Sequence, residues 1–237
     1  MHPVEISDLY FKYQDGNENI LNGINLKIES GKVTSILGLS GCGKSTLCYC
    51  ICGIVPHIYH GEIKGDVLLY GKPVSGMLPG KIATITGIVF QDPDTQLFSP
   101  TVEDEIAFGP ENLCIDRDEI ARRIDICLKL VNMEKHRFDH PENLSGGEKQ
   151  LIAIASVLSM DPSIIIFDES LSQIDREGKS RIKNVIFQLK NNGKAVIMVE
   201  HDPENLELAD EIYFLKNGKI EKIEDLKGGG FAGFYRV

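Results

Sequence analysis

The chain has 237 residues, 42% of them hydrophobic, and a formal net charge of −10 at pH 7. This size allows a large core, either in one domain or in two closely packed lobes. The negative charge argues against a nucleic-acid partner, which would need a basic stripe on the surface. No apolar run approaches the ~18 residues of a membrane span, and no secretory leader is visible, so a cytosolic location is expected.

In chain order, the first part of the sequence is rich in predicted strands. Runs of apolar and β-branched residues, separated by Gly and Pro clusters, indicate them. The predicted strands are Val4 to Tyr13, Ile24 to Ile28, Lys32 to Leu37, Glu62 to Tyr70 and Ile82 to Phe90.

Residues 38–45 read Gly-Leu-Ser-Gly-Cys-Gly-Lys-Ser and match the phosphate-binding loop pattern G-x-x-x-x-G-K-[ST] in full. The loop follows the strand Lys32 to Leu37 and precedes an apolar stretch, Thr46 to Ile54, that predicts a helix. Its glycines allow backbone N–H groups to surround phosphates. Lys44 supplies positive charge to the outer phosphates, and the Ser45 hydroxyl is a candidate Mg²⁺ ligand. The sequence therefore predicts a nucleotide-binding site rather than a plain glycine-rich turn.

The chain contains six cysteines, and their spacing matches no zinc pattern. Cys48, Cys50 and Cys52 alternate within the predicted helix and are expected to be buried thiols. Cys42 differs because it lies inside the phosphate loop, near Lys44 and a helix N-terminus. The hypothesis for Cys42 is a lowered thiol pKa and sensitivity to alkylation.

The middle of the chain is predicted to be helical. Glu119 to Val131 carries an apolar stripe with helical spacing, and Leu151 to Leu158 carries another. A strand–helix alternation then returns. Its predicted elements are strand Ser163 to Asp168, helix Asp175 to Lys190, strand Lys194 to Glu200, helix Pro203 to Ala209 and strand Glu211 to Leu215. We expect a single α/β domain of 237 residues, with a core lobe of residues 1–92 and 161–237 and a helical lobe of residues 93–160.

Four apolar residues followed by two acids, in the stretch Ser163 to Glu169, predict a central parallel strand buried on both faces. Ligands of open α/β sheets lie beyond the carboxyl ends of the strands, so both acids are expected beside the phosphates. Asp168 is the candidate to hold Mg²⁺, and Glu169 is the candidate general base for the attacking water.

The stretch Leu144 to Gln150, Leu-Ser-Gly-Gly-Glu-Lys-Gln, has a structural and a functional interpretation. Ser145 and Glu148 form a capping box that would begin a helix. A cap alone does not explain Gly146 and Gly147, which cost about 1 kcal/mol each against Ala in a helix. Two glycines and a serine at a helix N-terminus favour the close approach of an anion to bare amides. Because this second phosphate surface lies in the other lobe, we expect a head-to-tail dimer with shared sites.

With these motifs in place, the chain resembles the nucleotide-binding subunit of ATP-binding cassette (ABC) transporters along nearly its whole length. Residues 38–45 match the Walker A motif, Leu144 to Gln150 the family signature, and Ile164 to Glu169 the Walker B motif. The resemblance implies an ATPase that uses ATP and Mg²⁺. It also implies a phosphate-loop NTPase core of ABC type, with an N-terminal antiparallel β subdomain and an inserted α-helical subdomain.

The same resemblance assigns roles to isolated residues. Gln91 matches the Q-loop, a further Mg²⁺ contact, and His201 matches the switch histidine that contacts the γ-phosphate. Asp175 matches the D-loop, and Tyr13 the aromatic ring that stacks on adenine, although Tyr10 and Phe11 are nearby competitors. The catalytic residues implied are Glu169, His201, Gln91 and Lys44. The nucleotide-binding residues implied are Tyr13, Gly38, Leu39, Ser40, Gly41, Cys42, Gly43, Lys44, Ser45, Thr46, Gln91, Ser145, Gly146, Gly147, Glu148, Asp175 and His201.

Two positions depart from the family pattern. Ser170-Leu171 replaces the usual Pro-Thr after Walker B, and Gln173 stands in the D-loop where a small residue is usual. Neither removes a phosphate, metal or base contact, so hydrolysis is expected to survive. The departures leave the choice of dimer partner open, between a second copy and a paralogue.

A narrower likeness lies in residues 90–98 and 101–110, which resemble the ATPases of energy-coupling factor (ECF) and cobalt-type importers. It implies import of a vitamin or metal ion, a membrane coupling subunit, a substrate-binding membrane protein, and a place on the cytoplasmic face of the membrane. The alternatives are a soluble ABC ATPase not coupled to transport and a regulatory nucleotide-binding partner. Leu97 and Phe98 are expected to dock on the membrane subunit, with burial in the core as the alternative.

Overall fold

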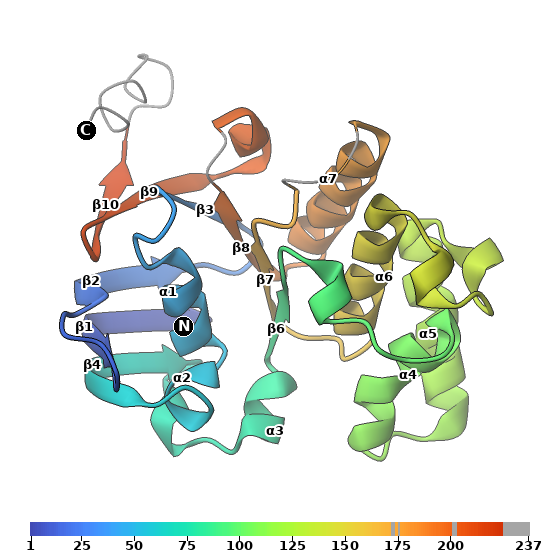
Figure 1. Ribbon diagram of the computed structural model, residues 1–237, viewed down its shortest axis with the longest axis horizontal. Helices are drawn as coiled ribbons and strands as arrows, with labels where there is room; N and C mark the ends of the chain where they lie inside the picture. Colours follow the sequence, from blue (N-terminus) through green and yellow to red (C-terminus); the bar gives the residue numbers. More distant parts are fainter. Residues whose placement is uncertain (172–173, 175, 201–202, 225–237) are drawn as a thin grey trace.

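The structure is a computed structural model that describes residues 1–171, 174, 176–200 and 203–224. Figure 1 shows two β-sheets on one side of the molecule and a group of helices on the other. The strands are β1 Val4–Tyr13, β2 Leu21–Ile28, β3 Val33–Leu37, β4 Gly61–Leu69, β5 Lys72–Pro73, β6 Thr86–Val89, β7 Ile164–Asp168, β8 Ala195–Glu200, β9 Glu211–Lys216 and β10 Lys219–Ile223. The α-helices are α1 Lys44–Ile51, α2 Ile54–His57, α3 Pro79–Ala83, α4 Val102–Asn112, α5 Arg117–Val131, α6 Gly146–Leu158 and α7 Arg176–Asn191. Short 3₁₀ helices are η1 Val74–Gly76, η2 Pro93–Thr95, η3 Glu134–His136, η4 Pro141–Asn143 and η5 Pro203–Leu208.

The first sheet is antiparallel and has four strands in the order β2-β1-β4-β5. Alternate residues of β1, among them Val4 and Ile6, face the interior, as expected for a strand with one buried face. The register of β1 shifts near Asp8, whose φ is 45°. This bulge bends the strand so that Leu9 and Phe11 also reach the core, where both are fully buried.

The second sheet has six strands in the order β10-β9-β3-β8-β7-β6. All its pairs are parallel except β9 with β10. Every residue of β3, β7 and β8 is buried. The expected central strand is thereby confirmed, because only a strand covered on both faces can consist entirely of buried residues.

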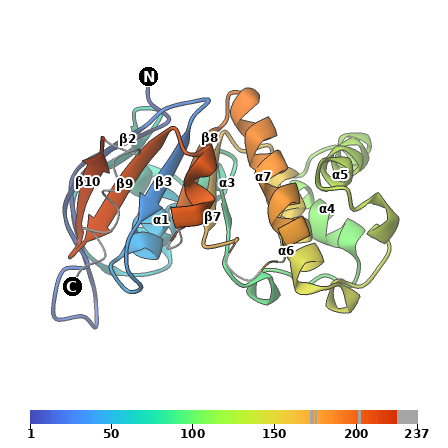
Figure 2. The same cartoon turned by 90° about the horizontal axis from the view of Figure 1, so that it is seen from above.

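Two apolar clusters cover opposite faces of this parallel sheet. Ile164 and Ile166 of β7 join the cluster shared with α1 and the antiparallel sheet. Ile165 and Phe167, which alternate with them, join the cluster shared with α4, α5, α6 and α7. The alternation of side chains along one strand thus connects both halves of the molecule. Figure 2 shows α1 among the sheets and the helical group on the other side.

The helical group is built on the stripes expected from the sequence. In α5 the buried residues are Ile120, Ile124, Cys127, Leu128 and Val131. The helix begins at Asp116, whose side chain accepts the backbone N–H of Asp118, and ends at Asn132 in the left-handed conformation. No helix in the described part of the chain is both long enough and apolar enough to cross a membrane.

Several elements differ from the sequence prediction. The strand predicted for Ile82 to Phe90 is only Thr86–Val89, because Pro79 begins a helix, α3, whose Ile82 is buried. The predicted helix Pro203 to Ala209 is a 3₁₀ helix, Pro203–Leu208. Helix α4 was not predicted, although Thr101 caps it through the Asp104 N–H and acidic residues fill its first turn. Strand β10 was also missed.

Candidate nucleotide site

The phosphate loop connects β3 to α1, as its sequence context predicted. Gly41 and Gly43 have φ values of 76° and 106°, a region that L side chains rarely adopt. Gly38 is required for a different reason, because a Cβ there would lie 2.5 Å from the Leu215 carbonyl oxygen and 2.6 Å from the Cys42 sulfur. The glycines therefore permit both the turn and its close packing against β9.

The Lys44 ammonium lies inside this loop. It donates to the carbonyl oxygens of Gly38 at 2.9 Å and Leu39 at 3.0 Å. It is also 3.3 Å from Glu169 Oε1, and the side chain is only 4% exposed. A cation held this way, at the N-terminus of an eight-residue helix, gives the loop a positive field for phosphate.

The two acids expected beside the phosphates follow β7, and the structure brings them to Lys44. Asp168 is buried and accepts a hydrogen bond from the Ser45 side chain. Burial raises the pKa of Asp168, while the Ser45 hydrogen bond and Lys44 oppose that rise. Its Oδ1 atom has no hydrogen-bond partner within the described residues. A buried carboxylate oxygen left in this way, beside a serine hydroxyl, fits Mg²⁺, which prefers oxygen ligands and keeps several waters.

Glu169 is in an unusual backbone conformation for its type, with φ 50°. Its N–H donates to the Val199 carbonyl at 3.0 Å, so the neighbouring strand β8 holds it there. The side chain is 20% exposed. The carboxylate is therefore held at a fixed position beyond β7, where water can reach it.

Tyr13 lies at the end of β1, against the helix that follows the phosphate loop. Its hydroxyl is 3.1 Å from Thr46 Oγ1, and its ring centroid is 4.8 Å from that of Phe11. Of its competitors, Phe11 is fully buried and Tyr10 is 41% exposed. The Tyr13 hydroxyl thus joins the end of β1 to α1.

Gln91 follows β6 and is exposed. The residue before it, Phe90, has both backbone groups bound by glutamine side chains. Its N–H donates to Gln96 Oε1 at 3.2 Å, and its carbonyl accepts Gln150 Nε2 at 3.0 Å. Gln150 belongs to the signature stretch, yet nothing in the sequence indicates that it reaches Phe90, since only the fold brings these positions together.

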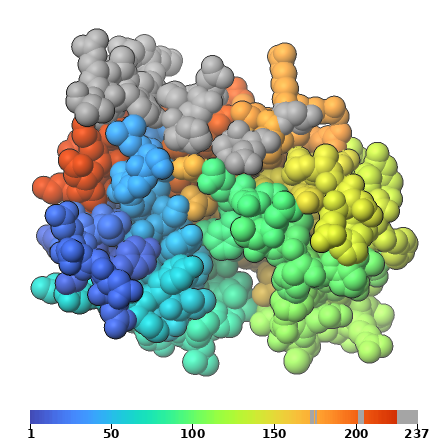
Figure 3. Space-filling view, in the orientation of Figure 1, coloured from blue at the N-terminus to red at the C-terminus, as the bar shows by residue number. Residues whose placement is uncertain are grey.

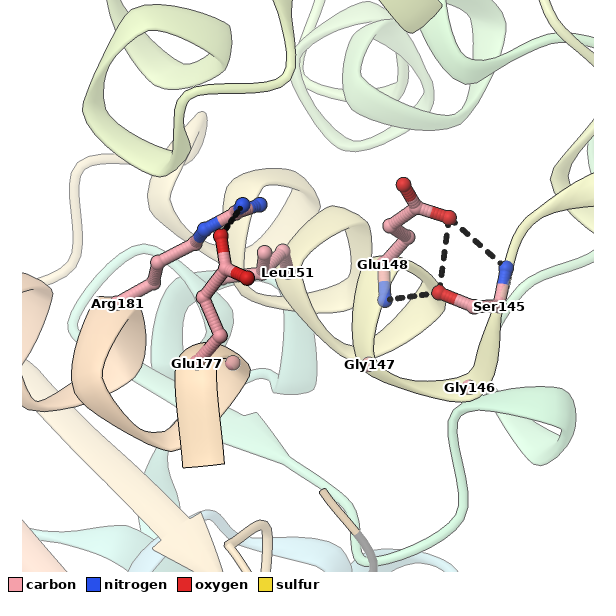
Figure 4. A pocket seen from close by; sticks show the side chains of 8 residues that line it. Ser145, Gly146, Gly147, Glu148, Leu151, Glu177 and Arg181 are labelled. Atoms are coloured by element: carbon pink, nitrogen blue, oxygen red, sulfur yellow. Dashed lines mark hydrogen bonds and ion pairs between the residues drawn. The ribbon is translucent and has the colours of Figure 1, made fainter. Parts of the chain in front are cut away.

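The capping box predicted for the signature stretch is confirmed. Ser145 Oγ accepts the Glu148 N–H at 3.4 Å, and Glu148 Oε2 accepts the Ser145 N–H at 3.0 Å. A Cβ on Gly146 would meet nothing within 4 Å. Figure 4 shows these residues around an open pocket of about 360 Å³, which Glu177 and Arg181 of α7 also line. The glycines therefore leave the helix N-terminus open to a ligand.

The expected site residues fall into two groups. Lys44, Ser45, Asp168 and Glu169 meet at the ends of β3 and β7, whereas Ser145 and its glycines lie at the start of α6, in the helical half (Figure 1). His201 and Asp175 lie outside the described residues. No group of three His, Cys, Asp or Glu side chains within the described ranges could hold a metal ion by itself.

The expected burial of the helix cysteines is confirmed for Cys48 and Cys50, and Cys52 is partly buried. The lowered pKa proposed for Cys42 is wrong. Burial raises the pKa of this thiol, and the opposing effect of Lys44 is smaller. The reason is that the Cys42 sulfur packs toward Gly38 and is removed from water, which disfavours the thiolate more than the nearby ammonium favours it.

A phosphate loop after one buried parallel strand, with an acid pair at the end of another buried strand of the same sheet, defines a phosphate-loop NTPase domain. The ABC transporter family profile matches residues 21–172. The chain belongs to the ABC transporter family and carries its ATP-binding domain. The predicted fold class is thereby confirmed, and so is the resemblance to energy-coupling factor ATPases, by the relatives below.

Among curated relatives, the chain is 40% identical over 225 residues to the energy-coupling factor transporter ATP-binding protein EcfA of Methanocaldococcus jannaschii, covering 94% of this chain and 78% of that protein. It is 42% identical over 219 residues to a putative ABC transporter ATP-binding protein of Methanosarcina acetivorans, covering 92% of this chain. That alignment spans only 34% of the Methanosarcina protein, about a third of its length.

The structure also resembles that of cbiO1 from Clostridium perfringens, described as part of the ABC transporter complex cbiONQ. The TM-score is 0.83 with 34% sequence identity, over 93% of this chain and 87% of the other. The likeness therefore extends over both the sheets and the helical group.

The raised Cys42 pKa predicts slow alkylation at neutral pH. In a Cys114→Ser variant, which removes the exposed cysteine, we expect iodoacetamide to modify Cys42 more slowly than free glutathione at pH 7.5. The rate should rise steadily up to and beyond pH 9, the ordinary value from which the pKa is raised. Peptide mass spectrometry measures this. A rate already at its plateau below pH 7 would restore the lowered pKa.

Proposed function

We propose that this chain is the ATP-hydrolysing subunit of an importer. Two subunits dimerise head-to-tail around two MgATP molecules, and the cycle powers import through a membrane coupling subunit. The observation that carries the proposal is the separation of the two anion-binding surfaces, since the phosphate loop and the start of α6 lie in different halves of the molecule (Figure 2). When ATP binds at the phosphate loop, the signature stretch of the other subunit completes the binding site around it.

Within one such site, each group has a distinct task. Residues 38–46 surround the phosphates, Lys44 neutralises the outer ones, and Tyr13 stacks on adenine. Ser45, Asp168 and Gln91 hold Mg²⁺, which neutralises charge on the phosphates when bound. Lys44 would exchange its loop carbonyls for phosphate oxygens on binding.

Hydrolysis rests on Glu169 as general base, with His201 contacting the γ-phosphate and Asp175 lying in the loop between subunits. The 3.3 Å contact between Glu169 and Lys44 supports this role. Once the ammonium turns to phosphate, the Glu169 carboxylate is released to accept a proton from water.

The partner surface lies beside the Q-loop. Phe98 is 66% exposed and Phe108 46% exposed, and their rings meet edge to face at 4.7 Å. They line a groove of about 240 Å³ together with Gly87, Val157 and other residues of β6, α4 and α6. Figure 3 shows a hollow in this region of the surface, between the segment near residue 80 and the green helical segment. A groove of this kind suits a helix of a membrane coupling subunit.

Movement at this surface can reach the signature through direct contacts. Gln96 and Gln150 both bind the backbone of Phe90, and Lys149 Nζ is 2.6 Å from Asp94 Oδ1. The segment of residues 90–98 is thereby joined to the first turns of α6. These contacts support transmission from Gln91 through Phe98 to the membrane subunit.

The imported molecule is a small nutrient of the vitamin or metal-ion class, recognised by a separate membrane protein. The support is the likeness to EcfA and to cbiO1, whose names refer to an energy-coupling factor transporter and an ABC transporter complex. The site of action is the cytoplasmic face of the membrane, with no nucleic-acid partner, in keeping with the net charge of −10. The core lobe of residues 1–92 and 161–237 and the helical lobe of residues 93–160 move against each other during the cycle.

The role of Glu169 is tested by Glu169→Gln. The amide keeps the shape and hydrogen bonding but cannot accept the proton, so ATP should bind, stay uncleaved and hold subunits together. Size-exclusion chromatography with MgATP should then show a dimer, and turnover should fall by at least about 100-fold. A variant that remains monomeric and still hydrolyses ATP removes Glu169 from this role. A co-expressed paralogue controls for an obligate heterodimer.

Shared sites are tested by mixing two inactive variants, Lys44→Ala and Ser145→Arg. Lys44→Ala should lose tight MgATP binding, whereas Ser145→Arg should keep binding and lose turnover. In a mixed dimer one site carries both changes and the other neither. Mixing equal amounts should recover up to about a quarter of wild-type turnover, because half the dimers then have one intact site of two. No recovery, with lost affinity in Ser145→Arg, contradicts the head-to-tail arrangement.

The partner surface is tested by a matched pair, Leu97→Ser and Phe98→Ser. Leu97 packs against the buried cluster of the helical half, so its loss should lower the unfolding free energy by ~2 kcal/mol or more. Phe98 is largely exposed and its loss should change stability by less than about 1 kcal/mol. Phe98→Ser should nevertheless fail to co-purify with the membrane subunit. Normal co-purification of a stable Phe98→Ser variant removes this residue from the interface.

A further inference from the structure

The segment that precedes the signature stretch is fixed to the helical half by ion pairs and backbone bonds. Arg137 pairs with Glu103 of α4 and with Asp125 of α5, the latter at 2.6 Å. The Val102 N–H donates to the Asp139 carbonyl at 3.0 Å. Residues 136–139 are thus a fixed platform beside the start of α6.

On this platform, four side chains form a chain of polar contacts that ends at the signature serine. Asp139 Oδ2 is 2.6 Å from His136 Nδ1, and His136 Nε2 is 3.5 Å from Glu148 Oε1. The other oxygen of Glu148 accepts the Ser145 hydroxyl at 2.8 Å and its N–H at 3.0 Å. His136 is therefore in contact with both a carboxylate of its own turn and the carboxylate that holds Ser145.

The imidazole is largely removed from water. Its side chain is 18% exposed, and Nε2 is buried with no hydrogen bond within the described part of the chain. A neutral ring that donates from Nδ1 to Asp139 would direct the Nε2 lone pair at the Glu148 carboxylate, which is repulsive. A protonated ring donates from Nδ1 to Asp139 and places its positive charge 3.5 Å from Glu148 Oε1. The geometry therefore suits the imidazolium.

The charge of this ring matters because of what Glu148 does at the helix N-terminus. The capping bonds from Ser145, the His136 charge and Lys135 all act to lower the pKa of Glu148, so a negative charge stands where an anion must approach. The other charged groups around His136 are Asp139 and Lys135 of its own segment and Arg137 with its partners on α4 and α5. The His136 ring itself contacts Glu148 directly, with Nε2 3.5 Å from Oε1.

We propose that His136 is a positioning residue for the signature serine. The imidazolium holds Glu148 on Ser145 and offsets its negative charge, so that the open N-terminus of α6 receives the terminal phosphate of an ATP carried by the other subunit. The charge state of His136 then sets how well the signature completes the site. This inference rests on the proposed function, since it requires that the signature serve an ATP site.

The test compares ATP turnover of wild type and His136→Gln over about pH 5.5 to 9, the range that spans imidazole titration. Glutamine keeps a polar amide but cannot become charged. Wild-type turnover should exceed that of the variant by about threefold to tenfold at the acid end, as for a partly buried charge at a helix terminus. The ratio of wild-type turnover to variant turnover should fall toward one as the pH rises and the imidazolium loses its proton.

A matched control is His140→Gln. The His140 ring caps the backbone N–H of Glu142 and is not in contact with Glu148, so its loss should leave the ratio flat with pH. The second arm is Glu148→Gln, which removes the opposing charge without touching the histidine. In that background His136→Gln should have no pH-dependent effect, because the pair acts through one interaction. Glu148→Gln alone should also flatten the profile, which keeps the test valid if His136→Gln folds poorly.

A ratio for His136→Gln that stays constant with pH, or an equal effect in the Glu148→Gln background, overturns the proposal in favour of a purely structural turn. Ser145→Arg separates this result from the proposed function. If Ser145→Arg abolishes turnover while the His136 ratio stays constant, only the role of His136 fails. If Ser145→Arg retains turnover, the signature does not serve the ATP site, and both proposals fail.

Discussion

The parallel pairing of β3, β8 and β7 is the constraint on which the rest of the structure depends. These strands are buried on both faces and run in the same direction, so their carboxyl ends meet at one edge of the sheet. Lys44 follows the first strand and the Asp168–Glu169 pair follows the third. Lys44 and Glu169, which are far apart in the sequence, thereby come together with Nζ 3.3 Å from Oε1. The pairing of the strands is what brings them to the same edge.

The charges gathered at this edge are only partly compensated within the described residues. The Lys44 ammonium is bound by two carbonyl oxygens and Glu169, whereas Asp168 keeps a buried oxygen without a hydrogen bond in the described structure. An unsatisfied buried carboxylate oxygen costs free energy. Such a cost is common where a ligand completes the coordination, and it distinguishes this edge from an ordinary sheet terminus. Burial of the Cys42 thiol raises its pKa more than the nearby Lys44 charge lowers it, which explains why this thiol is not activated.

The proposed second anion surface differs from the phosphate loop in the groups that would attract a phosphate. At the start of α6 the attraction for a phosphate comes from backbone amides and the helix dipole, and the capping carboxylate of Glu148 opposes it. The chain places His136 against that carboxylate. Gln150 extends from α6 to the backbone of Phe90, beside the Q-loop. The first turns of α6 are thereby joined to the segment that follows β6.

Much of the local structure could be predicted from the sequence, because its signals are local. The phosphate loop, the strand with two terminal acids, the capping box and the stripe of α5 each depend on residues close in the chain. The least accurate predictions concerned where helices and strands begin and end. Helix α3 begins at Pro79 and extends into the start of the predicted strand Ile82 to Phe90, and α4 was missed although Thr101 and three acids mark its start. The family resemblance extended these local signals to nearly the whole chain.

The residues that could bind phosphate were recognisable from the sequence, because glycines, a lysine and a capping serine carry that chemistry at fixed spacing. The effect of their charges depends on the tertiary structure. The tertiary structure decided that Lys44 is held by carbonyls, that burial raises the pKa of Cys42, and that Leu97 packs inward while Phe98 remains exposed. It also decided that His136 lies against Glu148. Burial and long-range contact set the electrostatics of a group, and neither can be read from its neighbours in the sequence.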